Sequence, residues 1–131
     1  MPRYLNPPTV PGTAGRYSQG VLLGPHAKRL IISGQVGRSA DGIIPEGLAA
    51  QAAQAIDNIL AIVQAAGLEP TDIVKLNVFC TQKGGVSTMR EVRLEKLGRH
   101  APASTYVEVA GLADPSYLVE IEGEAVREAD L

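Results

Sequence analysis

The longest regular pattern of apolar positions in the chain spans 47–66 and predicts one amphipathic helix. Apolar side chains recur there at intervals of three and four residues, the spacing of one helical face. They are Leu48, Ala52, Ala55, Ile56, Ile59 and Val63, whereas Gln51, Gln54, Asp57, Asn58 and Gln64 occupy the other positions. Gly67 follows where a helix commonly closes in a left-handed conformation, and Pro70 prevents continuation. A helix with this apolar stripe must lie across a sheet.

Runs rich in β-branched and aromatic residues predict the strands of that sheet. The predicted strands span 16–23, 29–36, 72–80, 105–110 and 117–126. The first two are separated by five residues and predict a hairpin. A second, shorter helix is predicted over 87–97, with Ser87 as its cap and Gly98 closing it. The order of elements indicates an α+β fold, with one mixed sheet and both helices on one of its faces.

The last predicted strand indicates that the other face of the sheet is polar. Its residues alternate, so Tyr117, Val119, Ile121, Gly123 and Ala125 share one face, and Leu118, Glu120, Glu122, Glu124 and Val126 share the opposite one. One face can therefore pack against the helices. The other face meets either water or another subunit, and the pattern leaves both possibilities open.

Length and composition suit one globular domain over 1–131, with residues 1–14 as an extended, proline-containing arm. A net charge of -2 gives no general attraction for nucleic acid or an anionic membrane. Cys80 is the only cysteine, which excludes an internal disulfide. No apolar run reaches the length of a membrane span or resembles a signal peptide. We therefore expect a cytoplasmic protein with no membrane partner.

Motifs for phosphate, dinucleotide and metal binding are missing from the sequence. There is no glycine-rich phosphate loop and no G-x-G-x-x-G after a strand. His26 and His100 are the only histidines, and no paired cysteines accompany them. We expect no metal site and no cofactor.

Short motifs along the chain resemble those of the RidA/YjgF family, and they occur in the family's order. Gly15-Arg16-Tyr17-Ser18-Gln19 resembles the family's G-P-Y-S-Q, and Ser33-Gly34-Gln35 its strand end S-G-Q. Further matches lie at 51–59, 66–75, 102–109, Leu112 and 119–122. The resemblance runs from about Gly15 to Val126, which is nearly the whole chain.

The resemblance implies a fold like that of chorismate mutase, assembled as a homotrimer with pockets between neighbouring subunits. It also implies hydrolysis of reactive imines and enamines, such as 2-aminoacrylate, to a ketoacid and ammonia. By correspondence with the family's motifs, Tyr17 and Glu120 are the candidate catalytic residues, and Ser33 and Gly34 line the substrate pocket. Without the resemblance, Tyr17 would be interpreted as a packed tyrosine and Glu120 as a solvated carboxylate.

One departure from the family pattern concerns the substrate carboxylate. Ser104 stands where the family's P-A-R-S motif has an arginine, so the usual two-pronged guanidinium contact is lost. Arg90, on the second predicted helix, is a candidate substitute, and Arg16 is a weaker one. The alternative for Arg90 is a solvated helix face formed by Arg90, Arg93, Lys96 and Arg99.

Three functions are compatible with these observations, and whether the chain is an enzyme stays open. The first is a deaminase of imines and enamines with altered specificity. The second is a non-catalytic trimer that binds small carboxylates or has a regulatory role. The third, an endoribonuclease, is disfavoured by the negative net charge and by the lack of aromatic residues within the basic run over 90–99.

Overall fold

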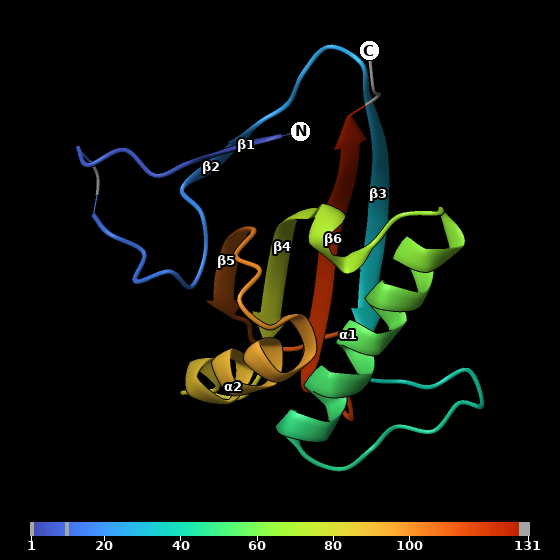
Figure 1. Cartoon of the computed structure of the whole chain (residues 1–131). Coiled ribbons are helices and arrows are strands. Elements are labelled where there is room, and N and C mark those ends of the chain that lie inside the picture. Colours follow the sequence, from blue (N-terminus) through green and yellow to red (C-terminus); the bar gives the residue numbers. More distant parts are fainter. Residues whose placement is uncertain (1, 10, 129–131) are drawn as a thin grey trace.

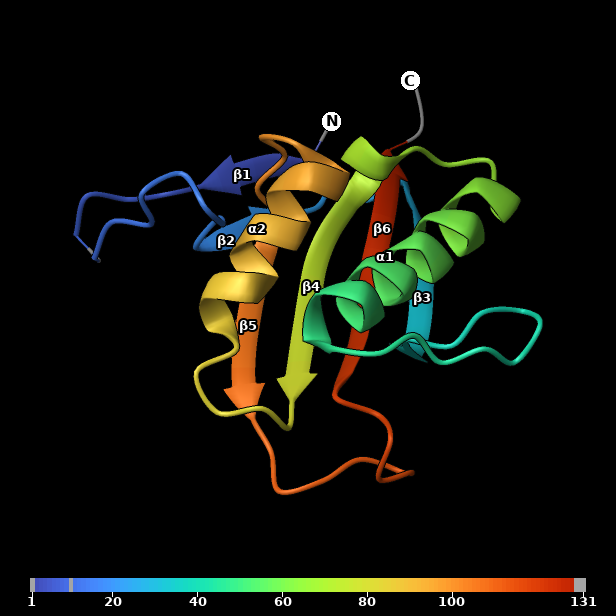
Figure 2. The same ribbon diagram turned by 90° about the horizontal axis from the view of Figure 1, so that it is seen from below.

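A four-stranded sheet with two helices on one face forms the body of the molecule (Figures 1 and 2). It is seen in a computed structural model that describes residues 2–9 and 11–128. In chain order the elements are β1 (Arg3–Leu5), β2 (Gly20–Leu22), β3 (Ala27–Val36), α1 (Leu48–Ala65), the 3-10 helix η1 (Pro70–Asp72), β4 (Ile73–Cys80), α2 (Val86–Leu97), β5 (Ala103–Glu108) and β6 (Val119–Glu128). Met1 and Val10 of the predicted arm, and 129–131 at the end of the predicted domain, lie outside the described residues. The boundaries of that domain stay a prediction.

The main sheet is mixed, as predicted, with the strand order β3-β6-β4-β5. Strand β6 is antiparallel to β3 and to β4, whereas β4 and β5 are parallel. Both helices cover the same face, with α1 against β3 and β6 (Figure 2). Strand β5 begins two residues earlier than predicted. The α+β class and the placement of both helices are confirmed.

Helix α1 packs through the face that its periodicity predicts, because all six apolar residues named for that face are buried. Gly67 closes the helix with a φ of 75°, as expected. Gln51, assigned from the pattern to the polar positions, is instead 3% exposed. Its amide nitrogen donates hydrogen bonds to the carbonyl oxygens of Pro45 and Ser116, and its amide oxygen accepts one from the Leu118 N–H. These bonds satisfy the buried amide and fix the loop before β6 against the helix.

The predicted hairpin between 16–23 and 29–36 is wrong. Strand β2 pairs with β1, and β3 pairs with β6. The backbone of Ser18, just before β2, donates a hydrogen bond to the Pro102 carbonyl and forms an isolated bridge with Ala103. Ser18 therefore lies beside β5, at one edge of the sheet, whereas β3 forms the opposite edge. The segment that joins β2 to β3 therefore runs from one edge of the main sheet to the other and does not form a hairpin.

Helix α2 begins at Val86 with Gly85 as its N-cap, so the predicted Ser87 cap is wrong. A side chain at Gly85 would place its Cβ 2.8 Å from Leu48 and 2.9 Å from Cys80, so the close packing of this turn requires glycine there. Gly98 closes the helix with a φ of 61°, as predicted. Across the described residues, neither helix has the length and apolarity needed to cross a bilayer.

Strand β6 alternates as predicted from Val119 to Ala125, whereas Val126, assigned by the pattern to the polar face, is 1% exposed. Its apolar residues Val119, Ile121 and Ala125 are buried against the helices, and Glu120, Glu122 and Glu124 lie on the opposite, open face. The pairing of β3 with β6 shifts register between Ile32 and Gln35, which leaves Ser33 and Gly34 in a bulge. Bulges bend a strand and change the direction of local side chains.

Candidate functional site

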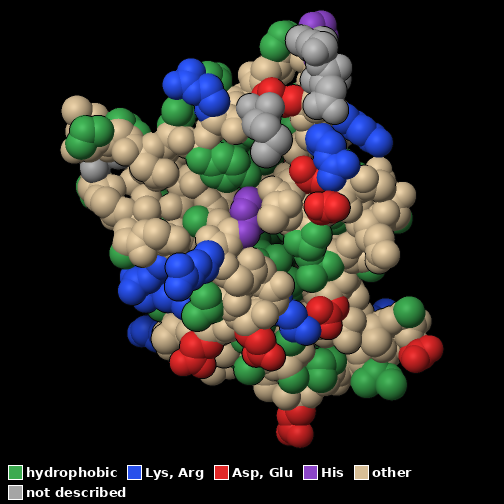
Figure 3. Space-filling view, in the orientation of Figure 1, with side chains coloured by type: hydrophobic (Ala, Val, Ile, Leu, Met, Phe, Trp, Pro, Cys, Tyr) green, Lys and Arg blue, Asp and Glu red, His purple; other side chains and the backbone are tan. Residues whose placement is uncertain are grey.

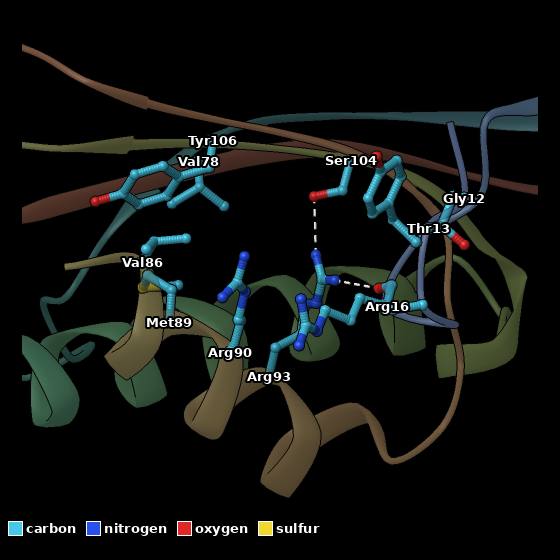
Figure 4. Close-up of a pocket in the computed structure, with 12 residues that line it drawn as sticks. Gly12, Thr13, Arg16, Val78, Val86, Met89, Arg90, Arg93, Ser104 and Tyr106 are labelled. Atoms are coloured by element: carbon cyan, nitrogen blue, oxygen red, sulfur yellow. Dashed lines mark hydrogen bonds between the residues drawn. The ribbon is translucent and has the colours of Figure 1, made fainter. Parts of the chain in front are cut away.

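A cavity of about 410 Å³ lies between α2, β5 and the segment at residues 12–17 (Figure 4). Val78, Val86 and Met89 give it an apolar wall, to which the rings of Tyr17 and Tyr106 add. Its polar groups include the hydroxyls of Thr13 and Ser104 and the guanidinium groups of Arg16, Arg90 and Arg93. The cavity therefore combines an apolar surface with three cations.

Strand alternation explains why Ser104 and Tyr106 face the cavity. In the parallel pairing of β4 with β5, Ser104 lies opposite Leu76 and Tyr106 lies opposite Val78. Leu76 and Val78 are buried beneath the helices, so their partners point to the same side of the sheet. Arg90 and Arg93 are three residues apart on α2 and so extend from one face of that helix toward β5 (Figure 4).

Arg93 is fixed in place by two hydrogen bonds (Figure 4). Its Nη1 donates to Ser104 Oγ at 2.8 Å, and its Nη2 donates to the backbone carbonyl oxygen of Arg16. The half-buried side chain thus joins α2 to β5 and to the segment that carries Tyr17. Burial, and secondarily the positive charge of Arg90, lower the pKa of the Arg93 guanidinium.

Arg90 and Arg16, the two candidate substitutes for the family's arginine, also line the cavity. Among the described residues, no side-chain hydrogen bond or ion pair engages either guanidinium group. The solvated face predicted as the alternative for Arg90 is confirmed in part, because Arg90 and Arg99 are exposed whereas Arg93 and Lys96 are half-buried. Lys96 forms an ion pair of 3.0 Å with Asp57 of α1, whereas Arg90 and Arg93 face the cavity.

A second hollow, of about 490 Å³, adjoins the first. It shares Arg16, Arg90 and Arg93 with the first cavity and adds Arg99 and His100. Figure 3 shows Lys and Arg side chains gathered on this side of the molecule, where α2 meets the N-terminal segment. The positive charge therefore extends across both hollows.

Tyr106 contributes a neutral wall to the cavity. Its hydroxyl donates a hydrogen bond to a Glu108 carboxylate oxygen at 3.2 Å. Burial raises the pKa of the Tyr106 phenol well above its ordinary value, and the neighbouring Cys80 and Glu108 raise it further. The phenol therefore stays protonated at neutral pH and adds no negative charge to offset the arginines.

Ser33, Gly34 and Glu120 form a separate group at the bulge between β3 and β6. A Cβ atom placed on Gly34 would collide with the Glu120 carboxylate, so these two residues are in close contact. None of the three lines the cavity beside α2. Glu120 pairs in register with Phe79 on the open face of the sheet, whereas Ser104 points to the helix face. Strands β3 and β5 form opposite edges, roughly 14 Å apart at the usual strand spacing.

The structure thus divides the residues predicted from the sequence into two groups. Tyr17, Ser104, Arg90 and Arg16 line the cavity, while Ser33, Gly34 and Glu120 lie at the bulge. Arg93 and Tyr106 were not predicted as site residues. Arg93 could have been found as the residue one helical turn after Arg90, and Tyr106 as the same-face neighbour of Ser104. Within the described ranges, no cluster of three or more His, Cys, Asp or Glu side chains could hold a metal ion.

Comparisons with known proteins agree with the fold. The family model described as Endoribonuclease L-PSP matches residues 8–127. The chain is 40% identical over 121 residues to the 2-iminobutanoate/2-iminopropanoate deaminase of Escherichia coli K12, covering 89% of this chain and 91% of that protein.

Solved structures agree as well. A Rid-family protein of unknown function, YyfB from Yersinia pestis, superposes with a TM-score of 0.83 at 28% identity, over 95% of this chain and 97% of that one. E. coli TdcF, solved with bound serine, gives a TM-score of 0.72 at 36% identity, over 96% and 99% of the two chains. The match to the family model, the identity to the deaminase and the shared fold all cover most of the chain. The chain therefore belongs to the RidA/YjgF family.

Proposed function

We propose that the protein hydrolyses reactive 2-imino and enamine acids in pockets completed by a neighbouring subunit of a homotrimer. In this reaction water adds to the C=N carbon, the C–N bond breaks, and a 2-ketoacid and ammonia leave. The reaction consumes only water, so it needs no redox partner. Its requirements are an anchor for the carboxylate and a group that moves protons between water and nitrogen.

Arg93 is the anchor for the substrate carboxylate in this proposal. Its hydrogen bond to Ser104 places a guanidinium beside the position from which the family's arginine extends. Two of its five N–H groups are used within the protein, so three remain for a ligand. Arg90, the substitute suggested by the sequence, lies on the same helical face and supports the anion with a second guanidinium. Ser104 therefore acts by holding Arg93 rather than by binding the charge itself.

Glu120 is the proton-transfer group, and it must come from another subunit. In one chain Glu120 lies on the open face of the sheet, and the arginine cavity lies on the helix face at the far edge. The open face also carries apolar side chains, because Ile31 is 62% exposed and Val107 is 40% exposed. A neighbouring copy that covers this face would bury them and bring its own bulge to the cavity. Tyr17 then contacts the substrate from the subunit that supplies the arginines. Ser33 and Gly34 contact it from the neighbouring subunit that supplies Glu120.

The hydrogen bond between Arg93 and Ser104 is the observation that carries this proposal, and an imine-trapping assay tests it. An amino-acid oxidase acting on 2-aminobutyrate generates the imine in the cuvette, and semicarbazide captures whatever has not been hydrolysed. We expect the protein to reduce semicarbazone formation and to increase free 2-ketobutyrate. Glu120→Gln should lower this activity by about a hundredfold, since loss of a general acid–base group has an effect of this order. Arg93→Gln should also lower it.

Arg38→Gln is the matched control, because Arg38 is an exposed arginine that lines neither hollow. This variant should hydrolyse the imine as fast as the unmodified protein. If the unmodified protein leaves semicarbazone formation unchanged, the deaminase proposal is wrong. Calorimetric binding of 2-ketobutyrate without turnover would then favour the non-catalytic carboxylate-binding function.

A further inference from the structure

The cavity carries more positive charge than a single carboxylate can neutralise. Arg16, Arg90 and Arg93 line it, and no Asp or Glu side chain of the described residues does so. The acidic residues of α2, Glu91 and Glu95, are exposed and line neither of the two hollows. With Glu120 of a neighbouring copy in the site, a monocarboxylate bound at Arg93 would still leave one of the three guanidinium groups without a counter-charge.

The grouping of these guanidinium groups around one cavity is therefore electrostatically unfavourable. The partners of Arg93 are a hydroxyl and a backbone carbonyl, which accept its hydrogen bonds but do not cancel its charge. The lowered pKa of Arg93 has the same origin, since burial and the nearby Arg90 both disfavour its positive charge. An anion that reaches both arginines would remove this repulsion. Each additional negative charge placed there gains affinity until the guanidinium groups are paired.

The arrangement of the arginines favours two anionic groups on one molecule. All three arginines border both hollows. Arg93 is fixed beside Ser104, whereas the guanidinium groups of Arg16 and Arg90 are held by no described side chain. The apolar wall of Val78 and Met89 offers a surface for a short carbon chain between the two anionic ends. Both side chains are only 5% exposed, so the surrounding core holds them in place.

We propose that the ligand of this cavity is an organic dianion, a 2-imino dicarboxylic acid as substrate and a 2-keto dicarboxylic acid as product. One carboxylate binds at Arg93, and the second binds between Arg16 and Arg90. The inference rests on the proposed function for the imine group, but the requirement for two carboxylates concerns binding alone. A ligand with two carboxylates explains why the cavity has three arginines, since one arginine would hold a monocarboxylate.

The test compares two ketoacids with the same five-carbon chain by isothermal titration calorimetry at low salt. 2-Ketoglutarate has a second carboxylate, and 2-oxopentanoate has a methyl group in its place. We expect 2-ketoglutarate to bind at least about tenfold more tightly, the gain expected for one added charge-assisted pair. Arg90→Gln and Arg16→Gln should each reduce this ratio, because each should weaken the binding of 2-ketoglutarate more than that of 2-oxopentanoate. Arg93→Gln should weaken both ligands, and Arg38→Gln should change neither.

Several results would overturn the inference. Equal affinity for the two ketoacids would do so, as would a preference that persists in both Arg90→Gln and Arg16→Gln. Displacement of 2-ketoglutarate by a short RNA at lower concentration would instead assign the arginines to nucleic acid. Because binding requires no turnover, the outcome is separate from the imine assay. Hydrolysis of the monocarboxylic imine without a dianion preference would leave the deaminase proposal standing and reject this one.

Discussion

At the scale of single residues, the guanidinium next to Ser104 extends from a helix rather than from the strand itself. Ser104 occupies a strand position where the family motif has arginine, and Arg93 of α2 extends its guanidinium to the Ser104 hydroxyl. A serine is small enough to admit that side chain and polar enough to hold it. In the proposed function, the pair Ser104–Arg93 binds the substrate carboxylate that one arginine binds in the family pattern.

Ser104→Ala tests whether the hydroxyl holds Arg93. Removing one hydrogen bond to a charged group costs about 1 kcal/mol at a partly exposed position, so the affinity for 2-ketobutyrate should fall about fivefold. Titration calorimetry measures this change. Ser87→Ala, at an exposed position of the same helix as Arg93, should bind as the unmodified protein does. An unchanged affinity in Ser104→Ala would show that Arg93 needs no support from the strand.

Gly34 and Gly37 should respond differently to the same added methyl group. In Gly34→Ala the new Cβ meets the Glu120 carboxylate, the mobile end of a side chain, so the protein should stay folded with Glu120 displaced. Imine hydrolysis should then fall while the melting temperature changes little. In Gly37→Ala the Cβ lies 2.6 Å from the backbone of Gln51 in α1, and the helix itself must move. We expect a loss of about 1–3 kcal/mol in the free energy of unfolding. Denaturation curves and the imine assay distinguish the two effects, and equal loss of stability in both variants would contradict this account.

Sequence reasoning reached some of these residues and missed others for physical reasons. Tyr17 and Ser104 were identified because each stands in a recognisable motif, and Arg90 because of its place on the second predicted helix; all three line the cavity. Arg93 carries no motif, and its role arises only when α2 is packed over β5. A basic residue on an exposed helix and one facing a cavity have the same local sequence, so only the packed structure distinguishes them.

At the scale of elements, the sequence pattern predicted the features of helices and strands that depend on neighbouring residues in the chain. The apolar stripe of α1, the alternation of β6 and the closing glycines Gly67 and Gly98 all appear in the structure as expected. Which strands pair was harder to predict, because the sequence of a three-residue strand such as β2 does not specify its partner. Its position follows from the contact of Ser18 with β5, which joins residues distant in sequence.

Gln51 gives a prediction at this scale, since its three hydrogen bonds join α1 to the loop that precedes it and to the loop before β6. Gln51→Leu keeps the side-chain volume but leaves the Leu118 N–H and two carbonyl groups without partners. We expect the free energy of unfolding to fall by about 2–3 kcal/mol, the cost of leaving buried polar groups unsatisfied. Chemical denaturation measures it. Gln64→Leu, at an exposed position of the same helix, is the control and should change stability by less than about 0.5 kcal/mol. A similar change in both variants would mean that the Gln51 bonds do not stabilise the fold.

At the scale of the whole molecule, the proposed site joins two groups that one chain holds apart. The arginine cavity lies at the β5 edge on the helix face, and Glu120 lies by the bulge on the open face. A ring of three identical chains can bring the bulge of one copy to the cavity of the next, so that each site has two contributors. The sequence could suggest this assembly only through its family resemblance, since no local pattern encodes how copies meet.

Complementation between inactive variants tests the shared site most directly. Arg93→Gln and Glu120→Gln are each prepared, checked for loss of imine hydrolysis, then unfolded together in equal amounts and refolded. Every mixed trimer contains one site built from two intact halves, so random assembly should restore about a quarter of the unmodified activity. Each variant refolded alone supplies the baseline. Activity of the mixture no higher than the sum of the two baselines would contradict a catalytic site formed between subunits.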